Sequence, residues 1–122
     1  MNDEVNAYAK GVLGEAAACD WLLKRGMELL ARRFHSPFGE IDLVMLDGET
    51  LVFVEVKARG RGGAALAQAA VTPAKRRRIV ETARCFLAQH PQHAARAVRF
   101  DVMTVAQDGV RHIPDAFWGS EW

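Results

Sequence analysis

The spacing of apolar residues predicts a long amphipathic helix near the start of the chain. Between Val5 and Leu23, apolar residues recur at intervals of three and four, the period of one helix face. Asn2 or Asp3 can serve as the N-cap, and Gly26 is a typical C-terminal stop. We therefore expect one helix that packs an apolar stripe against the rest of the protein.

A β-hairpin is the next predicted element. Apolar runs at residues 40–46 and 49–57 flank the dipeptide Asp47-Gly48, which is typical of two-residue hairpin turns. The second run is apolar at both odd and even positions until it nears its end. This pattern predicts a strand that is buried on both faces of a sheet.

A second helix is predicted to begin at Thr72-Pro73, with Thr72 as the N-cap and Pro73 in the first turn. The glycine-rich residues 60–63 predict a loop, and residues 64–71 fit either a short helix or loop. Further strands are predicted at residues 27–34, 97–105 and 110–113, with turns at 35–39 and 108–109. With no repeat or linker, residues 1–122 are expected to form a single α/β domain with a mixed central sheet and flanking helices.

Composition narrows the class of protein. The chain has 122 residues, 50% of them hydrophobic and 25% charged, which excludes a disordered tail, a collagen-like fibre and a disulfide-stapled miniprotein. Cys19 and Cys85 both lie in predicted helices, so we interpret them as two buried thiols and not as a disulfide. The acidic start and the lack of any apolar run of about 18 residues predict a cytoplasmic protein without a membrane partner.

The charges are segregated along the chain. The net charge is only +1, but residues 57–99 contain ten basic residues and one acid, whereas the remainder has six basic residues and fourteen acids. The candidate nucleic-acid-binding residues follow the hairpin or open the second helix: Arg59, Arg61, Lys75, Arg76, Arg77 and Arg78. Cations in a first helical turn oppose the helix dipole, which favours a phosphate partner over a merely solvated face. Since Phe86 and Phe100 fit core positions, we expect recognition of a duplex or branched backbone without base stacking.

The predicted hairpin brings three charged side chains to one face. With a two-residue loop Asp42 lies opposite Phe53 and diagonal to Glu55, and with a four-residue loop it lies directly opposite Glu55. Either register places Lys57 beside the two acids, whereas a three-residue loop with a bulge would separate them. A structural ion pair on an exposed sheet face remains the alternative interpretation of this group.

Two adjacent carboxylates repel each other unless a shared proton, a salt bridge or a divalent cation holds them together. Lys57 could provide the salt bridge. The four histidines show no zinc-type spacing with the cysteines, so Mg²⁺ or Mn²⁺ is the candidate cation. Glu15, at the border of the first helix's apolar face, could add a third carboxylate or simply point to water.

Several of these segments carry a family resemblance. They are GEIDLV at residues 39–44, VFVEVKAR at 52–59, GE at 14–15, RFDV at 99–102, Lys75 and Arg78-Ile79. Over nearly the whole chain they resemble the YraN-like family of predicted endonucleases. That family is distantly similar to archaeal Holliday junction resolvases within the PD-(D/E)XK superfamily. The resemblance implies a restriction-endonuclease-like core, in which Ile41 replaces the proline that names the motif.

The resemblance also implies a function. It assigns catalysis to Glu15, Asp42, Glu55 and Lys57, and metal binding to Asp42, Glu55 and Glu15. The implied activity is a Mg²⁺- or Mn²⁺-dependent endonuclease acting on duplex or branched DNA, with junctions or flaps as candidate substrates and a homodimer as a candidate assembly. The alternatives are a non-catalytic nucleic-acid-binding module with a vestigial site, and an interaction protein with a structural charge network. Trp118 and Trp122 fit either the core or a subunit contact.

Overall fold

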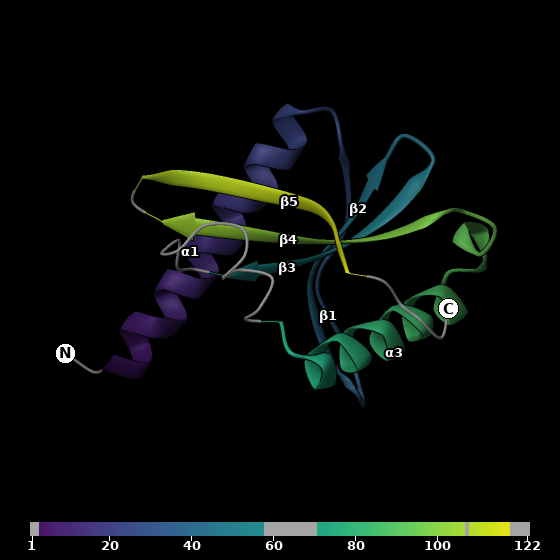
Figure 1. Cartoon of the computed structure of the whole chain (residues 1–122), viewed down its shortest axis with the longest axis horizontal. Coiled ribbons are helices and arrows are strands. Elements are labelled where there is room, and N and C mark those ends of the chain that lie inside the picture. Colours follow the sequence, from purple (N-terminus) through teal and green to yellow (C-terminus); the bar gives the residue numbers. More distant parts are fainter. Residues whose placement is uncertain (1–2, 58–70, 107, 118–122) are drawn as a thin grey trace.

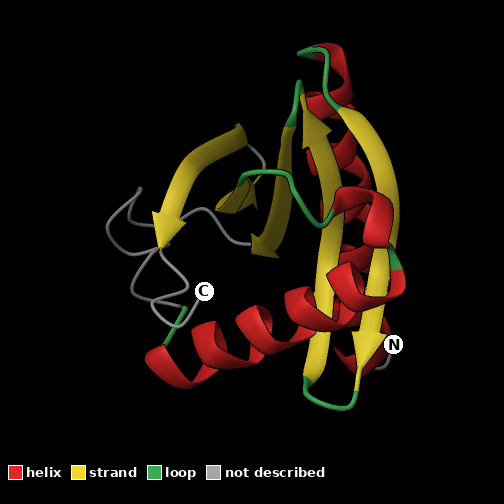
Figure 2. Ribbon diagram, turned by 90° about the vertical axis from the view of Figure 1, so that its right-hand side faces the viewer, coloured by secondary structure: helices red, strands yellow, loops and turns green. Residues whose placement is uncertain are grey.

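The computed structural model describes residues 3–57, 71–106 and 108–117, with side chains from residue 14 onward. Within these ranges a five-stranded sheet lies between two helices, α1 (Asp3–Lys24) and α3 (Pro73–Gln89) (Figures 1 and 2). The strands are β1 (Glu28–Ser36), β2 (Gly39–Asp47), β3 (Thr50–Lys57), β4 (Val98–Ala106) and β5 (Gly109–Phe117). The predicted α/β class, mixed sheet and flanking helices are confirmed.

The strands lie in the sheet in the order in which they occur along the chain, β1-β2-β3-β4-β5. All neighbouring pairs are antiparallel except β3 and β4, which are parallel. The connection between these two contains α3, as parallel pairing requires a crossover. This crossover sets the start of α3 near the end of β3.

The predicted helix boundaries are close to the observed ones. Gly26 adopts φ 90°, and the N–H of Met27 donates to the carbonyl oxygen of Leu22 at 3.2 Å, a capping arrangement that ends α1. At α3, Thr72 Oγ1 accepts the backbone N–H of Lys75 at 3.2 Å, and Pro73 occupies the first turn. The N-cap of α3 therefore fixes where its basic first turn lies.

Two hydrophobic cores cover opposite faces of the sheet. One packs α3 against the face of β3 that carries Leu51 and Phe53, and the other packs α1 against the face that carries Val52 and Val54. Residues 51–55 are all buried, so the prediction of a doubly covered strand is confirmed. Both cysteines are free, with Cys19 buried and Cys85 half-buried.

Several element boundaries differ from the predictions. The hairpin pairs Asp47 with Thr50, so its loop is Gly48-Glu49 and not Asp47-Gly48. Gly48 has φ 59°, and glycine adopts such a conformation at the first loop position without steric cost. β1 extends to Ser36 and β5 to Phe117, and a 3₁₀ helix, η1 (Pro91–His93), follows α3.

No helix of the described chain is both long and apolar enough to cross a lipid bilayer. The predicted loop at residues 60–63, the stretch 64–70, and Trp118 and Trp122 lie outside the described residues.

Candidate active site

Asp42 and Glu55 meet where β2 separates from β3. The pairing of the two strands runs from Asp47–Thr50 to Leu43–Val54, and the next step in this register places Asp42 beside Glu55. This register, with Asp42 directly opposite Glu55, is the one predicted for a four-residue loop, although the observed loop has only two residues. Beyond it the Asp42 side chain replaces the backbone ladder, because its Oδ2 accepts the N–H of Val56 at 2.7 Å.

The backbone departs from regular strand geometry around Asp42 in β2 and at the adjacent position of β1. Ile41 packs in the core under α3, whereas Leu43, two residues further, packs under α1, so the alternation of faces breaks between them. In β1 the neighbouring residue is Arg33, which has φ 49°. A left-handed conformation costs a non-glycine residue roughly 1–2 kcal/mol. Such strain is concentrated at functional sites in many proteins.

Glu55 is a nearly buried carboxylate, 8% exposed, held between two lysines. Its Oε1 lies 3.6 Å from Lys57 Nζ on the same strand and 3.0 Å from Lys75 Nζ in the first turn of α3. Lys75 was assigned from the sequence to a nucleic-acid-binding surface, and the structure places it within the acidic cluster. One sequence signal could have found it, since Lys75 precedes the buried Ile79 by four residues and so shares its helix face.

Burial and repulsion make this cluster electrostatically unusual. Burial, together with the charge of Glu55, raises the pKa of Asp42 to about 7, even though the hydrogen bond from Val56 opposes the shift. Burial and the contact with Lys75 lower the pKa of Lys57. Burial alone would lower the pKa of Lys75 too, but contact with Lys57 and attraction by Glu55 raise it. The pKa values of the two lysines are therefore shifted in opposite directions.

Glu15 lies at the edge of the cluster. Its Oε2 accepts a charge-assisted hydrogen bond from Arg33 Nε at 2.7 Å, and its negative charge contributes to the raised pKa of Asp42. The carboxylate that was predicted to border the buried face of α1 is therefore half-buried and paired with β1. The left-handed backbone of Arg33 accompanies this contact between β1 and α1.

The cluster offers carboxylate oxygens that could bind a metal ion. Among the described residues, no group of three or more His, Cys, Asp or Glu side chains has a metal-binding arrangement. Asp42 and Glu55 alone supply carboxylate oxygens, which suits Mg²⁺, an ion that commonly keeps several waters and uses one or two carboxylates. Asp42 and Glu55 therefore fit a hydrated cation, whereas the carboxylate of Glu15 forms an ion pair with Arg33.

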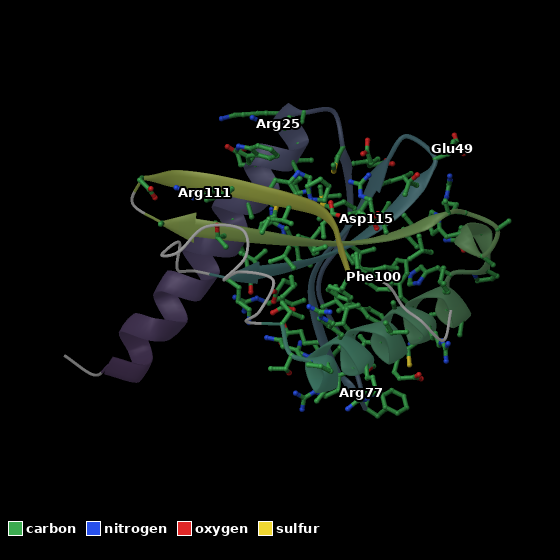
Figure 3. The ribbon with its side chains drawn as sticks, in the orientation of Figure 1. Arg25, Glu49, Arg77, Phe100, Arg111 and Asp115 are labelled. Carbon is green, nitrogen blue, oxygen red and sulfur yellow. The ribbon has the colours of Figure 1, made fainter. Side chains whose placement is uncertain are left out.

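The predicted nucleic-acid-binding residues divide into groups. Arg77 and Arg78 are exposed, and Figure 3 shows Arg77 on the outer side of α3, away from the sheet. Arg76 instead turns inward, where its Nε donates to the carbonyl oxygen of Val71 at 2.9 Å and its guanidinium lies 5.4 Å from the Phe117 ring centre. Arg59 and Arg61 lie outside the described residues.

A second charged network lies on the α1 side of the sheet. Asp101 of β4 is fully buried, and Arg99 donates to its two carboxylate oxygens at 2.9 and 3.0 Å. His112 Nε2 lies 2.6 Å from Asp101 Oδ2, and the N–H of Asp115 donates to Oδ1 at 2.9 Å. Because the partners of Asp101 belong to β4 and β5, its carboxylate joins these two strands. The network was not predicted from the sequence.

Sequence comparison relates the chain to bacterial proteins. Residues 14–105 match the model of an uncharacterised protein family, UPF0102. A UPF0102 protein of Rhodopseudomonas palustris strain BisB18 is 42% identical over 116 residues, covering 94% of this chain and 84% of the relative. A UPF0102 protein of Alcanivorax borkumensis is 45% identical over 94 residues, covering 77% and 75%. These names state no activity.

Proposed function

We propose that this chain, which belongs to the UPF0102 family, is a Mg²⁺- or Mn²⁺-dependent endonuclease that acts on duplex or branched DNA. The observation that carries the proposal is the convergence of Asp42 and Glu55 from adjacent strands with Lys57 and Lys75 beside them. Two acids and a lysine at the end of a hairpin are suited to phosphodiester hydrolysis, because they can serve a metal, a water and a phosphate together.

Each residue has a chemical role in this proposal. Asp42 and Glu55 would hold Mg²⁺, which supplies polarisation of the scissile phosphate and a bound water of lowered pKa. Lys57, whose pKa is lowered by burial, would orient the attacking water and accept its proton. The water oxygen would bond to phosphorus, the bond from phosphorus to O3′ would break, and O3′ would take a proton from solvent water. The products are a 5′ phosphate and a 3′ hydroxyl.

Lys75 would have a separate role in the same reaction. Its ammonium group neutralises Glu55 at 3.0 Å before a metal binds. Once a cation takes over that carboxylate, the Lys75 ammonium would be released from Glu55 and would contact a non-bridging phosphate oxygen. Electrostatic stabilisation of the developing phosphorane charge needs a permanent cation, and Lys75 fits this role better than Lys57.

The second candidate is a non-catalytic nucleic-acid-binding module. The ion pairs favour it, because Lys75 already neutralises Glu55 and Arg33 already neutralises Glu15. In that case the charged cluster would stabilise the fold, and the exposed arginines of α3 would bind a nucleic-acid backbone.

A cleavage assay distinguishes the two. The protein is incubated with junction, flap, nicked and linear DNA in Mg²⁺, in Mn²⁺ and in EDTA, beside Asp42→Asn, Lys57→Met and the control Lys24→Met. Lys24 is an exposed residue of α1, so its substitution should leave activity unchanged. We expect cleavage that requires the cation and falls about 10²-fold or more in the two site variants.

Other outcomes would reject the enzyme. Binding of DNA without cleavage by any form would establish the module instead. Absence of binding at moderate salt would leave an interaction protein in which these charges form a structural network. Cleavage that Asp42→Asn leaves intact would indicate a contaminating nuclease.

A further inference from the structure

The turn between β1 and β2 presents an exposed aromatic side chain. Phe38 is 50% exposed, and among the described residues it and Leu23, at 42%, are the large hydrophobic side chains left exposed. From the sequence, residues 35–39 were predicted only as a turn, and no aromatic residue was expected to stack on a base. The structure places such a residue at the tip of a hairpin.

The tip is held rigidly. Ser36 Oγ accepts the backbone N–H of Phe38 at 3.0 Å, so the turn closes on a side-chain hydrogen bond. The same oxygen forms a hydrogen bond of 2.8 Å with Thr82 Oγ1, a fully buried residue of α3. Pro37 restricts the backbone between them. These bonds fix the backbone that carries the ring, so the turn loses little conformational freedom on binding, which favours a preorganised contact.

The surroundings of the tip are cationic. A Cβ atom at Gly39 would lie 3.8 Å from Arg78 Cβ, so the hairpin passes directly beside the basic turn of α3. Arg77 and Arg78 are exposed, and neither forms an ion pair with an acid of the described chain. The hairpin that carries the exposed Phe38 thus runs beside an exposed arginine, and an aromatic ring combined with cationic groups is typical of surfaces that stack bases and bind phosphates.

The tip is also close to the acidic cluster. Phe38 precedes Asp42 by four residues along the chain, and at about 3.3 Å per residue the two backbones are separated by at most about 13 Å. That span corresponds to about four nucleotide steps of 3.4 Å along one strand. A strand bound at Asp42 and Glu55 could therefore reach Phe38 without leaving the surface.

We propose that Phe38 stacks on an unpaired base of a nucleic acid whose backbone lies along α3, so that this surface selects duplexes carrying a branch or single-stranded segment. The proposal deepens the proposed function, on which it rests for the position of the cleavage site, but the stacking itself requires only binding. It also replaces the expectation of pure backbone recognition with contact to the face of a base.

The test separates stacking from cleavage by working in EDTA. Flap DNA carrying 2-aminopurine at the branch point and a fully paired duplex are titrated with wild type, Phe38→Ala, Phe38→Trp and the control Leu23→Ala. We expect Phe38→Ala to weaken flap binding roughly 5- to 150-fold, the range for loss of one base–aromatic stack. Binding to the duplex should change less than about twofold, because duplex contacts are electrostatic. Phe38→Trp and Leu23→Ala should retain flap binding.

The 2-aminopurine signal gives a direct readout. Stacking on the ring should change its fluorescence on binding of wild type, and Phe38→Ala should abolish that change even at saturating protein. Equal losses for flap and duplex, or an unchanged signal in Phe38→Ala, would overturn the proposal. So would light scattering that shows a dimer of wild type converted to a monomer by Phe38→Ala, which would assign the tip to self-association.

Together with the cleavage assay in Mg²⁺ or Mn²⁺, this experiment distinguishes failure of stacking from failure of the enzyme. Flap-selective binding that depends on Phe38, in a protein that never cleaves, would uphold this inference and reject the nuclease. Cation-dependent cleavage by a protein whose flap binding does not depend on Phe38 would support the nuclease and reject this inference. A wild type that binds neither DNA would overturn both.

Discussion

At the scale of single residues, Asp42 illustrates a conflict between stability and chemistry. Its carboxylate is desolvated beside Glu55, and the pKa is raised to about 7 by burial first and by that charge second. Ionising it in the folded protein at neutral pH therefore costs free energy. Proteins tolerate such costs where a charged group serves binding or catalysis. The left-handed backbone of the neighbouring Arg33 is a further free-energy cost to the folded state.

Asp42→Asn should stabilise the protein at alkaline pH. The folded pKa of about 7 lies above the ordinary value of 3.8, so the stability that protonated Asp42 contributes is present below about pH 4 and is lost as pH rises through about 7. Without divalent cations, we expect urea unfolding at pH 8 to show the variant more stable by about 1–4 kcal/mol. The asparagine oxygen can still accept the N–H of Val56.

Two controls accompany this measurement. The difference between wild type and Asp42→Asn should shrink toward pH 4, and added Mg²⁺ should raise the Tm of wild type while leaving that of the variant unchanged. A difference that is independent of pH would show that Asp42 is not the group whose ionisation costs stability.

At the scale of elements, the buried Asp101 network fastens β5 to β4. The carboxylate accepts from Arg99 on its own strand and from His112 and Asp115 on β5, and Arg99 Nη1 also donates to Asp47 Oδ2 of β2 at 3.1 Å. Burial alone would raise the pKa of Asp101, but the hydrogen bonds from His112 and Arg99 outweigh it and lower the pKa. Asp101 thus joins β4 to β5, and Arg99 joins β4 to β2.

Asp101→Ala should destabilise the protein by about 3–5 kcal/mol, because it leaves a partly buried guanidinium without its carboxylate. The lowered folded pKa means that this stability is present above the ordinary pKa of 3.8 and is lost as pH falls through the folded value. Chemical denaturation at pH 7 and pH 3 measures both effects. The matched control is Asp108→Ala, an exposed acid 3.6 Å from Arg111, which should cost less than about 1 kcal/mol. Equal costs for the two variants would contradict the assignment.

At the scale of the whole molecule, the distribution of charge matters more than its total. The net charge of +1 averages a basic segment with an acidic remainder. Folding turns part of the basic segment inward, since Lys75 joins Glu55, Arg76 contacts Val71, and Arg99 joins Asp101. Arg77 and Arg78 remain exposed on α3, and Figure 3 places Arg77 and Arg25 on opposite edges of the molecule.

Arg77→Ala combined with Arg78→Ala should weaken DNA binding uniformly across sequences. Each phosphate contact that is lost should reduce the slope of log K against log salt by about 0.9, so we expect a slope shallower by up to about 2. Fluorescence anisotropy at several salt concentrations measures it. Arg25→Ala, an exposed arginine at the opposite edge, is the control. An unchanged slope in the double variant would place the DNA elsewhere on the protein.

The sequence by itself determined the hairpin, the proximity of Asp42 to Glu55, and the start of α3 at Thr72-Pro73. These features are local: side chains alternate with period two along a strand, and a cap depends on neighbouring residues. The loop position was missed because Gly48-Glu49 and Asp47-Gly48 both fit a tight turn, and the choice rests on pairing along the whole ladder.

The tertiary structure alone decided what reaches the site from distant elements. Lys75 contacts Glu55 because of how α3 packs across the sheet, and Arg33 contacts Glu15 because α1 covers the other side. The turn that carries Phe38 is tied to α3 by the hydrogen bond of Ser36 with Thr82. The position of a helix relative to the sheet follows from packing between segments far apart in the chain, so a local pattern can show which helix face Lys75 shares but not that this face meets Glu55.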